Sequence, residues 1–375
     1  MTSTGDTGLR GSEGETLISE REQKVLNIIE TARAKRQKFR DTQITMAHGA
    51  GGKATQSLIE GLLVPAFANA TLEAMADAGT VPVLGGNVAM TTDSFVVNPI
   101  SFPGGTIGEL AVNGTVNDLS MAGAKPLALT LSLILEEGLP ADILKEQVAA
   151  IAATAAAAGV PIVAGDTKVV ERGACDQMYI CTTGMGVLDD RASLSPSSLR
   201  PGDKILVSGR IGDHGTAIML ARGEFDLESD IESDTMCLWP MVDTLLDQVG
   251  PSLRCLRDAT RGGVASVLNE LARASHVAMV INEAAVPVHP AVAGAAEILG
   301  IDPMHVANEG KMVVIAAPEA ADAALAALRS APGGEEAAII GECKTEPEGM
   351  VLMATAFGGK RVMDQLVGDP LPRIC

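Results

Sequence analysis

Beyond its first 43 residues the chain alternates between strand-forming and helix-forming segments, and this alternation constrains its fold more than any other feature. Val88–Val97 and Met178–Leu188 are rich in β-branched and apolar residues, which is typical of buried strands. Thr106–Ala124 and Pro140–Ala158 instead carry small and apolar residues at helical spacing. Because 375 residues exceed the usual size of one domain, we expect an α/β (α+β) protein of two domains.

The same alternation continues in the second half, after a turn at Arg200–Asp203 that we interpret as the domain boundary. Strands are expected at Pro161–Val170, Lys204–Ser208, Val277–Ile281, Lys311–Ala316 and Ala338–Cys343. Helices are expected at Thr216–Arg222, Met236–Val249, Val264–Ala274 and Pro318–Arg329. The predicted parts are an N-terminal helical extension (1–43), two domains (44–200 and 201–363) and an extended, mobile tail (364–375), in which two prolines exclude a helix.

The N-terminal extension has a helix-start signal. Ser19–Glu22 has the spacing of a capping box, and a charged segment with apolar residues at Val25, Leu26, Ile28 and Ile29 follows it. This segment is either a helix that binds a partner or stabilises a dimer, or a partly ordered extension. The sequence leaves both interpretations open.

The charge of the chain excludes several classes of partner. Against 28 Lys and Arg residues stand 47 Asp and Glu residues, which gives a net charge of -19, and aromatic residues make up only 2%. This balance repels phosphate backbones and offers few rings for base stacking, so we expect no nucleic-acid partner. No apolar stretch reaches the roughly 20 residues of a membrane span, and the polar N-terminus does not resemble a signal peptide. We therefore expect a cytoplasmic protein without a membrane partner.

Carboxylates and one amide interrupt segments that are otherwise apolar: Asp93, Asn117, Asp118, Asp166 and Asp258. A buried carboxylate without a partner costs several kcal/mol or takes up a proton, and a shared divalent cation resolves that cost. Hard oxygen ligands suit Mg²⁺, which usually binds together with nucleotide phosphates. For each residue taken alone, a helix cap or an ion pair with Lys168, Arg261 or Lys311 is the competing interpretation.

Three glycine-rich turns are candidates for phosphate binding through backbone amides. They are Gly49–Gly52, Gly209–Gly215 and Gly262–Gly263, and Lys53 and Arg261 could add positive charge. The usual nucleotide motifs are missing, since Lys53 is followed by Ala54 rather than by Ser or Thr. Each turn taken alone is more often an ordinary turn.

Six cysteines occur without a CxxC pair, and five of them are expected to be small core or surface residues. Cys375 differs because it is the last residue of a proline-containing tail, where we expect a thiol to have almost no packing value. Exposed thiols invite oxidation and are usually avoided. A carrier thiol that enters a nucleotide site is therefore the interpretation we favour over an accidental cysteine at an exposed end.

Taken together, these motifs resemble HypE, the carbamoyl dehydratase family of [NiFe]-hydrogenase maturation. The internal motifs are shared across the wider PurM-like ATP-binding superfamily, which includes aminoimidazole ribonucleotide synthetase and selenophosphate synthetase, whereas the terminal Pro-Arg-Ile-Cys is specific to HypE. The segments that carry the resemblance are residues 48–53, 91–97, 116–124, 165–170, 258–263, 308–310 and 372–375. The family core normally begins close to the first of these segments, so the preceding residues are additional here.

The resemblance implies a homodimer in which the N-terminal halves form a joint β-barrel, with an α/β domain beside it and ATP and Mg²⁺ as cofactors. It assigns metal binding to Asp93, Asp118, Asp166 and Asp258. It assigns nucleotide binding to Gly51, Gly52, Lys53, Asn117, Thr167, Thr260, Arg261, Gly262 and Gly263. The implied protein partners are the carbamoyltransferase HypF, which loads the terminal cysteine, and the HypC–HypD complex, which receives the cyanide for the iron.

The implied reaction is an ATP-dependent dehydration of a carbamoyl group on Cys375 to a thiocyanate. The carbamoyl oxygen cannot leave as hydroxide, so ATP must convert it to phosphate, and a base must remove the nitrogen protons. The resemblance assigns the base to Glu309 and an assisting charge to Lys168; an ion pair of Glu309 with Lys311 is the competing interpretation. The alternatives are a PurM-like synthetase with a diffusible substrate, of the selenophosphate or aminoimidazole ribonucleotide type, and a non-catalytic partner-binding scaffold.

Overall fold

The computed structural model describes residues 39–42, 45–49, 51–66, 70–83, 85–223, 230–355, 358–366 and 374–375. All of them belong to one unit, Gln37–Cys375. The helix expected within 1–43 lies outside the described residues, as do residues 367–373 of the expected tail. No helix of the described part is both long and apolar enough to cross a membrane.

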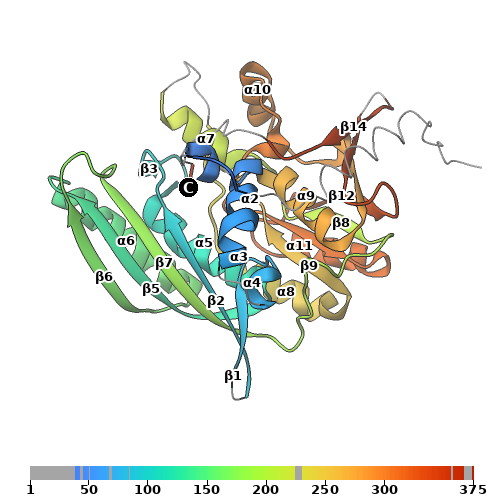
Figure 1. Ribbon diagram of the computed structural model, residues 1–375, viewed down its shortest axis with the longest axis horizontal. Helices are drawn as coiled ribbons and strands as arrows, with labels where there is room; N and C mark the ends of the chain where they lie inside the picture. Colours follow the sequence, from blue (N-terminus) through green and yellow to red (C-terminus); the bar gives the residue numbers. More distant parts are fainter. Residues whose placement is uncertain are drawn as a thin grey trace, which may run out of the picture. The chain divides into compact units, whose positions relative to one another are not determined.

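A five-stranded sheet with the strand order β1-β2-β7-β5-β6 organises the first half (Figure 1). Its strands are β1 (Gly79–Val83), β2 (Gly86–Phe95), β5 (Ala124–Glu136), β6 (Ile162–Val170) and β7 (Met178–Leu188). Only β5 and β6 are parallel, because the long helix α6 (Ala141–Ala158) connects them. The expected strands and helices of this half are confirmed within a few residues, but β5, the longest strand, was not predicted.

The two faces of this sheet differ. Helix α5 (Ile107–Met121) packs on one face, and α6 packs on α5. Beside the sheet lie β3 (Ser101–Phe102) and β4 (Gly105–Thr106), which form a separate pair. The rest of the sheet leaves large apolar side chains exposed, among them Met90, Val163, Val169, Met185 and Val187. Exposed apolar side chains in this number on one sheet are typical of a surface that another molecule covers.

A seven-stranded mixed sheet organises the second half, in the order β14-β13-β10-β12-β8-β11-β9. Its strands are β8 (Lys204–Val207), β9 (Leu253–Asp258), β10 (Ala278–Asn282), β11 (Met312–Ala316), β12 (Ala338–Lys344), β13 (Val351–Ala354) and β14 (Lys360–Met363). In β8, Ile205 and Val207 face a core that includes α9 (Gly263–Ser275), whereas Leu206 faces a core that includes α8 (Trp239–Val249) and α11 (Ala321–Ser330). Helices therefore cover both faces of the sheet.

Several elements of the second half begin at other positions than expected or were not predicted. Helix α7 spans Asp213–Ala221 and begins three residues before the expected Thr216, because Gly212 takes the left-handed conformation (φ 87°) that ends the preceding turn. Strand β9, helix α10 (Pro290–Leu299) and strands β13 and β14 were not predicted.

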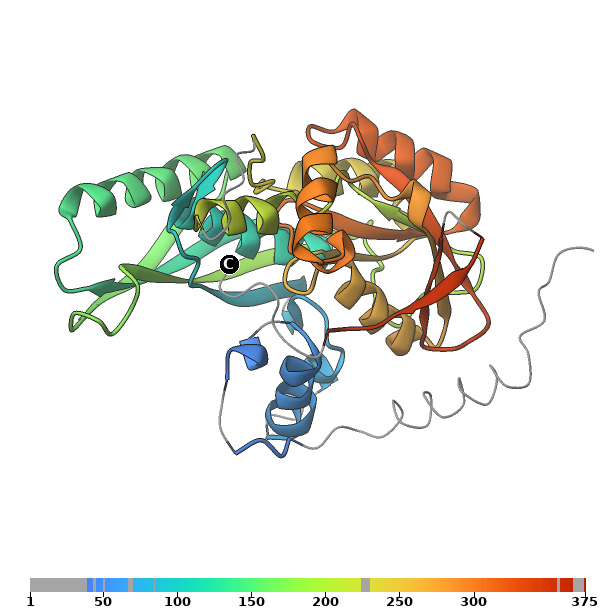
Figure 2. The ribbon, with the colours of Figure 1, turned by 90° about the horizontal axis from the view of Figure 1, so that it is seen from above.

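Short helices form the segment between the first glycine turn and β1. They are α2 (Lys53–Leu58), the π-helix Ile59–Leu63, α3 (Val64–Ala66) and α4 (Ala70–Glu73), and Figure 2 shows them on the side of the first sheet opposite α6. Helix α5 contacts both β9 and α8, and it is almost completely buried. This buried helix therefore brings residues of both halves together at the candidate site.

Candidate active site

Carboxyl groups from three elements gather beside the buried helix α5. Asp93 projects from β2, Asp118 from the last turn of α5, and Asp258 ends β9. Two threonine hydroxyls hold the first two: Thr115 Oγ1 donates to Asp93 Oδ2 at 2.8 Å, and Thr91 Oγ1 donates to Asp118 Oδ2 at 2.6 Å. Three of the four predicted metal ligands are thus neighbours in the structure.

The pKa values of these carboxyl groups show that they share one negative field. Burial raises the pKa of Asp118 well above its usual range, and the charges of Asp93, Asp258 and Asp77 raise it further. Burial also raises the pKa of Asp93, and it raises that of Asp258 to about 6 despite the opposing charge of Arg257. Neighbouring buried carboxyl groups with raised pKa values are typical of a functional site, where a bound cation can neutralise their negative charge.

Asp77 belongs to this group and was not predicted. Burial raises its pKa to about 8, although its Oδ1 lies only 3.0 Å from Nε of Arg257. Asp77 stands in a bend before β1, without the apolar strand residues around it that drew attention to Asp93. Its position at the entrance to a strand that pairs with β2 is the signal that could have identified it.

These carboxyl groups can hold Mg²⁺ only if a bound substrate supplies further oxygen ligands to the ion. Among the described residues, no group of three His, Cys, Asp or Glu side chains is arranged to hold a metal ion unaided. Magnesium usually takes one or two protein carboxylates and completes its shell with water and substrate phosphates. Asp93, Asp118, Asp258 and Asp77 therefore suit an ion that arrives together with a phosphate-bearing substrate.

Within a single chain the structure does not bring Asp166 to these carboxylates, so its role as a metal ligand stays a prediction. Asp166, Thr167 and Lys168 lie on the exposed strand β6, where Lys168 Nζ pairs with Asp166 Oδ2 at 2.5 Å. This pairing and the Thr167 amide lower the pKa of Asp166, whereas burial raises those of the other acids. Asp166 and Thr167 line a surface hollow of about 660 Å³ together with Leu131, Leu133 and Ile162–Gly165. Strands β2 and β6 each carry an aspartate among apolar residues, which suggested a single site. In the sheet, however, β7 and β5 lie between these two strands.

Two of the predicted glycine turns pack directly on each other. A Cβ at Gly51 would lie 2.7 Å from the Arg261 carbonyl oxygen, and Ser266 Oγ donates to the Gly51 carbonyl at 3.2 Å. Gly262 and Gly263 have φ values of 76° and 60°, which only glycine adopts readily, and Thr260 precedes them in the turn that begins α9. Gly52 caps α2, and Lys53 Nζ lies 2.9 Å from Asp364 Oδ2, so Lys53 is part of an ion pair.

Asn117 serves a different purpose from the predicted nucleotide contact. Its Nδ2 donates to the carbonyls of Met236 at 2.9 Å and Glu309 at 3.2 Å, and its Oδ1 accepts from the Leu238 amide at 2.8 Å. The residue is only 1% exposed. Asn117 therefore ties α5 to two segments of the second half, and its amide protons are both in use.

Glu309 lies beside the same helix as a buried carboxyl group. It is 4% exposed, and its Oε1 has no hydrogen-bond partner among the described residues. Burial raises its pKa well above the usual range, the charges of Asp258 and Asp234 raise it further, and Arg261 opposes them. Gly114 of α5 lies near this side chain but leaves room for the Phe95 ring, since a Cβ there would lie 2.9 Å from Phe95 and 4.0 Å, an ordinary contact distance, from Glu309 Oε2. The predicted ion pair with Lys311 is not formed, because Lys311 Nζ faces Asp234 Oδ2 at 4.0 Å.

The expectation that Cys375 has no packing role is wrong. Cys375 is 8% exposed and Ile374 is 7% exposed, and the latter belongs to the core of the first half. The Cys375 backbone oxygen accepts a hydrogen bond at 3.2 Å from the amide of Val96, which directly follows β2. The charge at Cys375 is the strongest influence that raises the pKa of Arg261, ahead of Glu309 and Asp93. The last two residues therefore lie inside the site.

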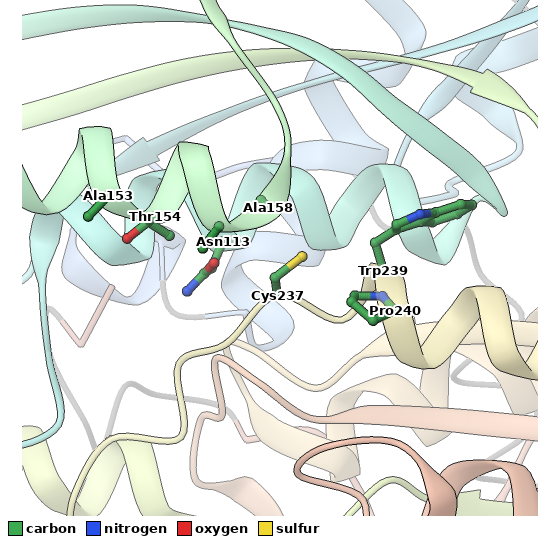
Figure 3. A pocket seen from close by; sticks show the side chains of 8 residues that line it. Asn113, Ala153, Thr154, Ala158, Cys237, Trp239 and Pro240 are labelled. Carbon is green, nitrogen blue, oxygen red and sulfur yellow. The ribbon is translucent and has the colours of Figure 1, made fainter.

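A separate apolar pocket lies away from these residues. It has a volume of about 380 Å³ and is lined by Asn113, Cys237, Trp239, Pro240 and four residues of the C-terminal half of α6 (Figure 3). None of the predicted site residues contributes to it. The pocket therefore carries no part of the predicted chemistry.

Comparison with known proteins identifies the family of this chain. Residues 75–188 match the family model of the AIR synthase related protein N-terminal domain, and residues 200–353 match that of its C-terminal domain. The carbamoyl dehydratase HypE of Rhizobium leguminosarum bv. viciae is 49% identical over 333 residues, which cover 89% of this chain and 95% of that protein. The chain belongs to the HypE family of carbamoyl dehydratases. It is therefore a dehydratase of the machinery that matures hydrogenases.

Solved structures of the HypE family have the same fold. The HypE chain of a HypE–HypF complex is 47% identical, with a TM-score of 0.79, and the match covers 83% of this chain and all of that one. A HypE structure in complex with ATP is 46% identical, with a TM-score of 0.75 over 89% of this chain and all of that one. The PurM-like fold expected from the motifs is confirmed.

Proposed function

We propose that the protein uses ATP and Mg²⁺ to dehydrate a carbamoyl group carried on its own Cys375, which yields a thiocyanate for the iron of [NiFe]-hydrogenase. One observation carries this proposal: the thiol-bearing residue is buried inside the site instead of lying exposed. A synthetase that acts on a diffusible substrate needs that space for the substrate itself. The ATP-bound relative supports the nucleotide.

Glu309 is the proposed base. Its Oε1 is buried and has no partner among the described residues, so a carbamoyl NH₂ beside Cys375 would satisfy it. Burial raises the pKa of Glu309, which makes its carboxylate a stronger proton acceptor, and the positive charge of Arg261 opposes this shift and favours the ionised form that a base needs. Arg261 faces both Cys375 and Glu309, and it is therefore placed to stabilise negative charge on the carbamoyl oxygen.

Asp93, Asp118 and Asp258 would hold Mg²⁺, with Asp77 close enough to influence them electrostatically. When bound, Mg²⁺-ATP supplies the phosphoryl group that allows the carbamoyl oxygen to leave as phosphate. The C–O bond then breaks, the nitrogen gives up its two protons and the C≡N bond forms on sulfur. The packed turns at Gly51–Gly52 and Gly262–Gly263 are the proposed phosphate contacts, because they lie at the N-termini of α2 and α9. The Gly51 and Gly263 amides donate to Thr55 Oγ1 and to the Thr260 carbonyl, so the amides of Gly52 and Gly262 are the proposed donors.

Mass spectrometry of the C-terminal peptide tests this function. After incubation with a carbamoyltransferase of the HypF type, a carbamoyl donor such as carbamoyl phosphate, and ATP, Cys375 should first gain a carbamoyl group and then lose the mass of one water. Glu309→Gln should stop at the carbamoyl stage. Carbamoylation without water loss in the wild-type protein contradicts the proposed dehydration, and an unmodified Cys375 contradicts the carrier role.

We further propose that a second copy of the chain brings Lys168 and Asp166 to this site. Both lie on the exposed strand β6, on a sheet that leaves Val163, Val169 and Met185 uncovered. A homodimer in which two such sheets form a joint barrel would bury these apolar side chains. It would also bring Lys168 of one copy to the active site of the other copy. We also propose that the two domains of each copy span residues 44–200 and 201–363, as expected from the sequence.

Mixed dimers of two inactive variants decide whether Lys168 acts across the dimer. Lys168→Ala and Glu309→Gln should each be inactive alone. When the two chains are co-expressed in equal amounts, half of the dimers are mixed, and each mixed dimer has one complete site, so about a quarter of the activity should return. No recovery contradicts action across the dimer.

HypF and the HypC–HypD complex are the proposed partners for loading Cys375 and for receiving the cyanide. The relative solved with HypF supports the first of these. A non-catalytic scaffold would bind no Mg²⁺-ATP and would be indifferent to Asp118→Ala, which calorimetry can measure directly.

A further inference from the structure

The last two residues of the chain are held by one hydrogen bond from each half. The Val96 amide donates to the Cys375 carbonyl, and His214 Nε2 lies 2.7 Å from the Ile374 carbonyl oxygen. A carbonyl oxygen only accepts, so Nε2 of His214 must carry a proton. Figure 1 shows the C-terminus beside α7, the helix whose first turn contains His214.

The surroundings of His214 determine which of its nitrogens carries that proton. The ring is completely buried and packs edge-on against Phe102, with the ring centroids 5.6 Å apart. Burial lowers the pKa of His214, which favours the neutral ring with a single proton. Ser233 Oγ lies 2.8 Å from Nδ1 and already accepts from the Thr235 amide at 3.2 Å. The Ser233 hydroxyl proton therefore points at Nδ1, and the ring proton remains on Nε2, where Ile374 needs it.

Asp234, the residue after Ser233, holds the backbone of Glu309, the proposed base. Asp234 Oδ1 accepts a hydrogen bond from the Glu309 amide at 2.9 Å. Asn308 Oδ1 in turn accepts from the Gly212 amide at 2.7 Å, immediately before α7. Two adjacent residues, Ser233 and Asp234, thus contact the His214 ring and the backbone of Glu309, respectively.

We propose that His214, oriented by Ser233, is a positioning residue that holds the Ile374 carbonyl and thereby places the Cys375 thiol within the site. This inference rests on the proposed function for its role in dehydration, but the placement itself is a property of the free protein. His214 touches none of the reacting atoms. His214 instead increases the fraction of molecules in which the carbamoylated cysteine is correctly placed. The dehydration rate should be proportional to that fraction.

Alkylation of Cys375 by iodoacetamide, followed on the C-terminal peptide of the full-length protein, measures this placement. His214→Leu removes the donor, and Cys375 should react about tenfold faster, which corresponds to about 1.4 kcal/mol. His214→Gln retains an amide donor and should restore most of the protection. His289→Leu is the matched control: His289 caps α10 through its Nδ1, so its loss lowers stability without touching the terminal residues.

Ser233→Ala is the second variant if His214→Leu does not fold. It keeps the ring but removes the hydroxyl that fixes the ring proton, so a smaller acceleration of a few fold is expected. Equal alkylation rates in the wild type and the folded variants overturn the inference. Alkylation follows the displaced fraction of molecules and dehydration follows the correctly placed fraction, so single-turnover dehydration of carbamoylated protein should slow only in proportion to the loss of placed molecules, at unchanged ATP affinity. Failure of the wild type to dehydrate would overturn the proposed function, whereas the alkylation comparison would still decide the placement.

Discussion

Replacement of Asp258 by asparagine is expected to stabilise the free protein while it impairs Mg²⁺-ATP binding. Asp258 is enclosed at the end of β9, and burial together with the charge of Asp93 raises its pKa from the ordinary value of 3.8 to about 6. Folding therefore works against its ionisation at neutral pH. Asparagine has nearly the same shape and no charge, so the folded state of the variant does not incur this cost.

The magnitude follows from the difference between the folded and unfolded pKa values. A shift from 3.8 to about 6 corresponds to about 3 kcal/mol at pH 7, at 1.36 kcal/mol per pKa unit. Below pH 3.8 both states are protonated, and the variant should have no advantage. The advantage should grow as the pH rises from about 4 to about 6 and stay constant above that range.

Urea unfolding of the metal-free protein at pH 4 and at pH 7 measures the effect. Asp166→Asn is the matched control, because Asp166 is exposed, is paired with Lys168 and has a lowered pKa. It should not be stabilised at either pH. The same Asp258 variant should bind Mg²⁺-ATP at least tenfold more weakly. A variant that is less stable than the wild type at pH 7, or that gains equally at both pH values, refutes the electrostatic argument.

Three further predictions concern the metal, Asn117 and the turn after Glu309. Mg²⁺ affinity should rise between pH 6 and pH 8, because Asp258, with a pKa of about 6, must lose its proton to bind the ion, and ionisation of Asp77, with a pKa of about 8, adds negative charge beside it; calorimetry in two buffers should detect the protons released. Asn117→Ala leaves three buried backbone groups without partners and should lower the free energy of unfolding by about 2–5 kcal/mol, whereas a normal melting temperature with weakened ATP binding contradicts its structural role. Gly310→Ala places a Cβ 1.8 Å from a backbone oxygen and should destabilise by about 1–3 kcal/mol and slow dehydration; Gly294→Ala, in open space on α10, should be neutral or stabilising in the same melting experiment.

The elements with strong periodicity could be predicted from the sequence. Strands β2, β6 and β7 and helices α5 and α6 differ from the expected limits by at most three residues. Strand β5 was missed although its sequence signals it: leucines stand at every second position from Leu127 to Leu135, with Ala128, Thr130 and Ser132 between them, which is the strand period. Its place between β7 and β6 depends on pairing with strands that are distant in the sequence.

The residues of the candidate site also fall into those that could be predicted from local sequence and those that could not. Asp93, Asp118 and Asp258 could be predicted because each is a charge in an apolar segment, and such a charge needs a partner. Asp166 has the same local pattern, yet it lies on an exposed strand, because nothing in a strand's own residues reports which neighbours it has.

By itself the sequence determined the class of chemistry in this protein: carboxyl groups among apolar residues, glycine turns and a terminal cysteine. These are local features, and their physical cost or conformational freedom can be judged residue by residue. Only the tertiary structure decided that Asn117 is a structural residue, that Asp77 joins the acidic group, and that Cys375 is buried next to the residues of both halves. The reason is that hydrogen-bond partners, burial and electric field depend on contacts between distant segments, such as the one from His214 to Ile374.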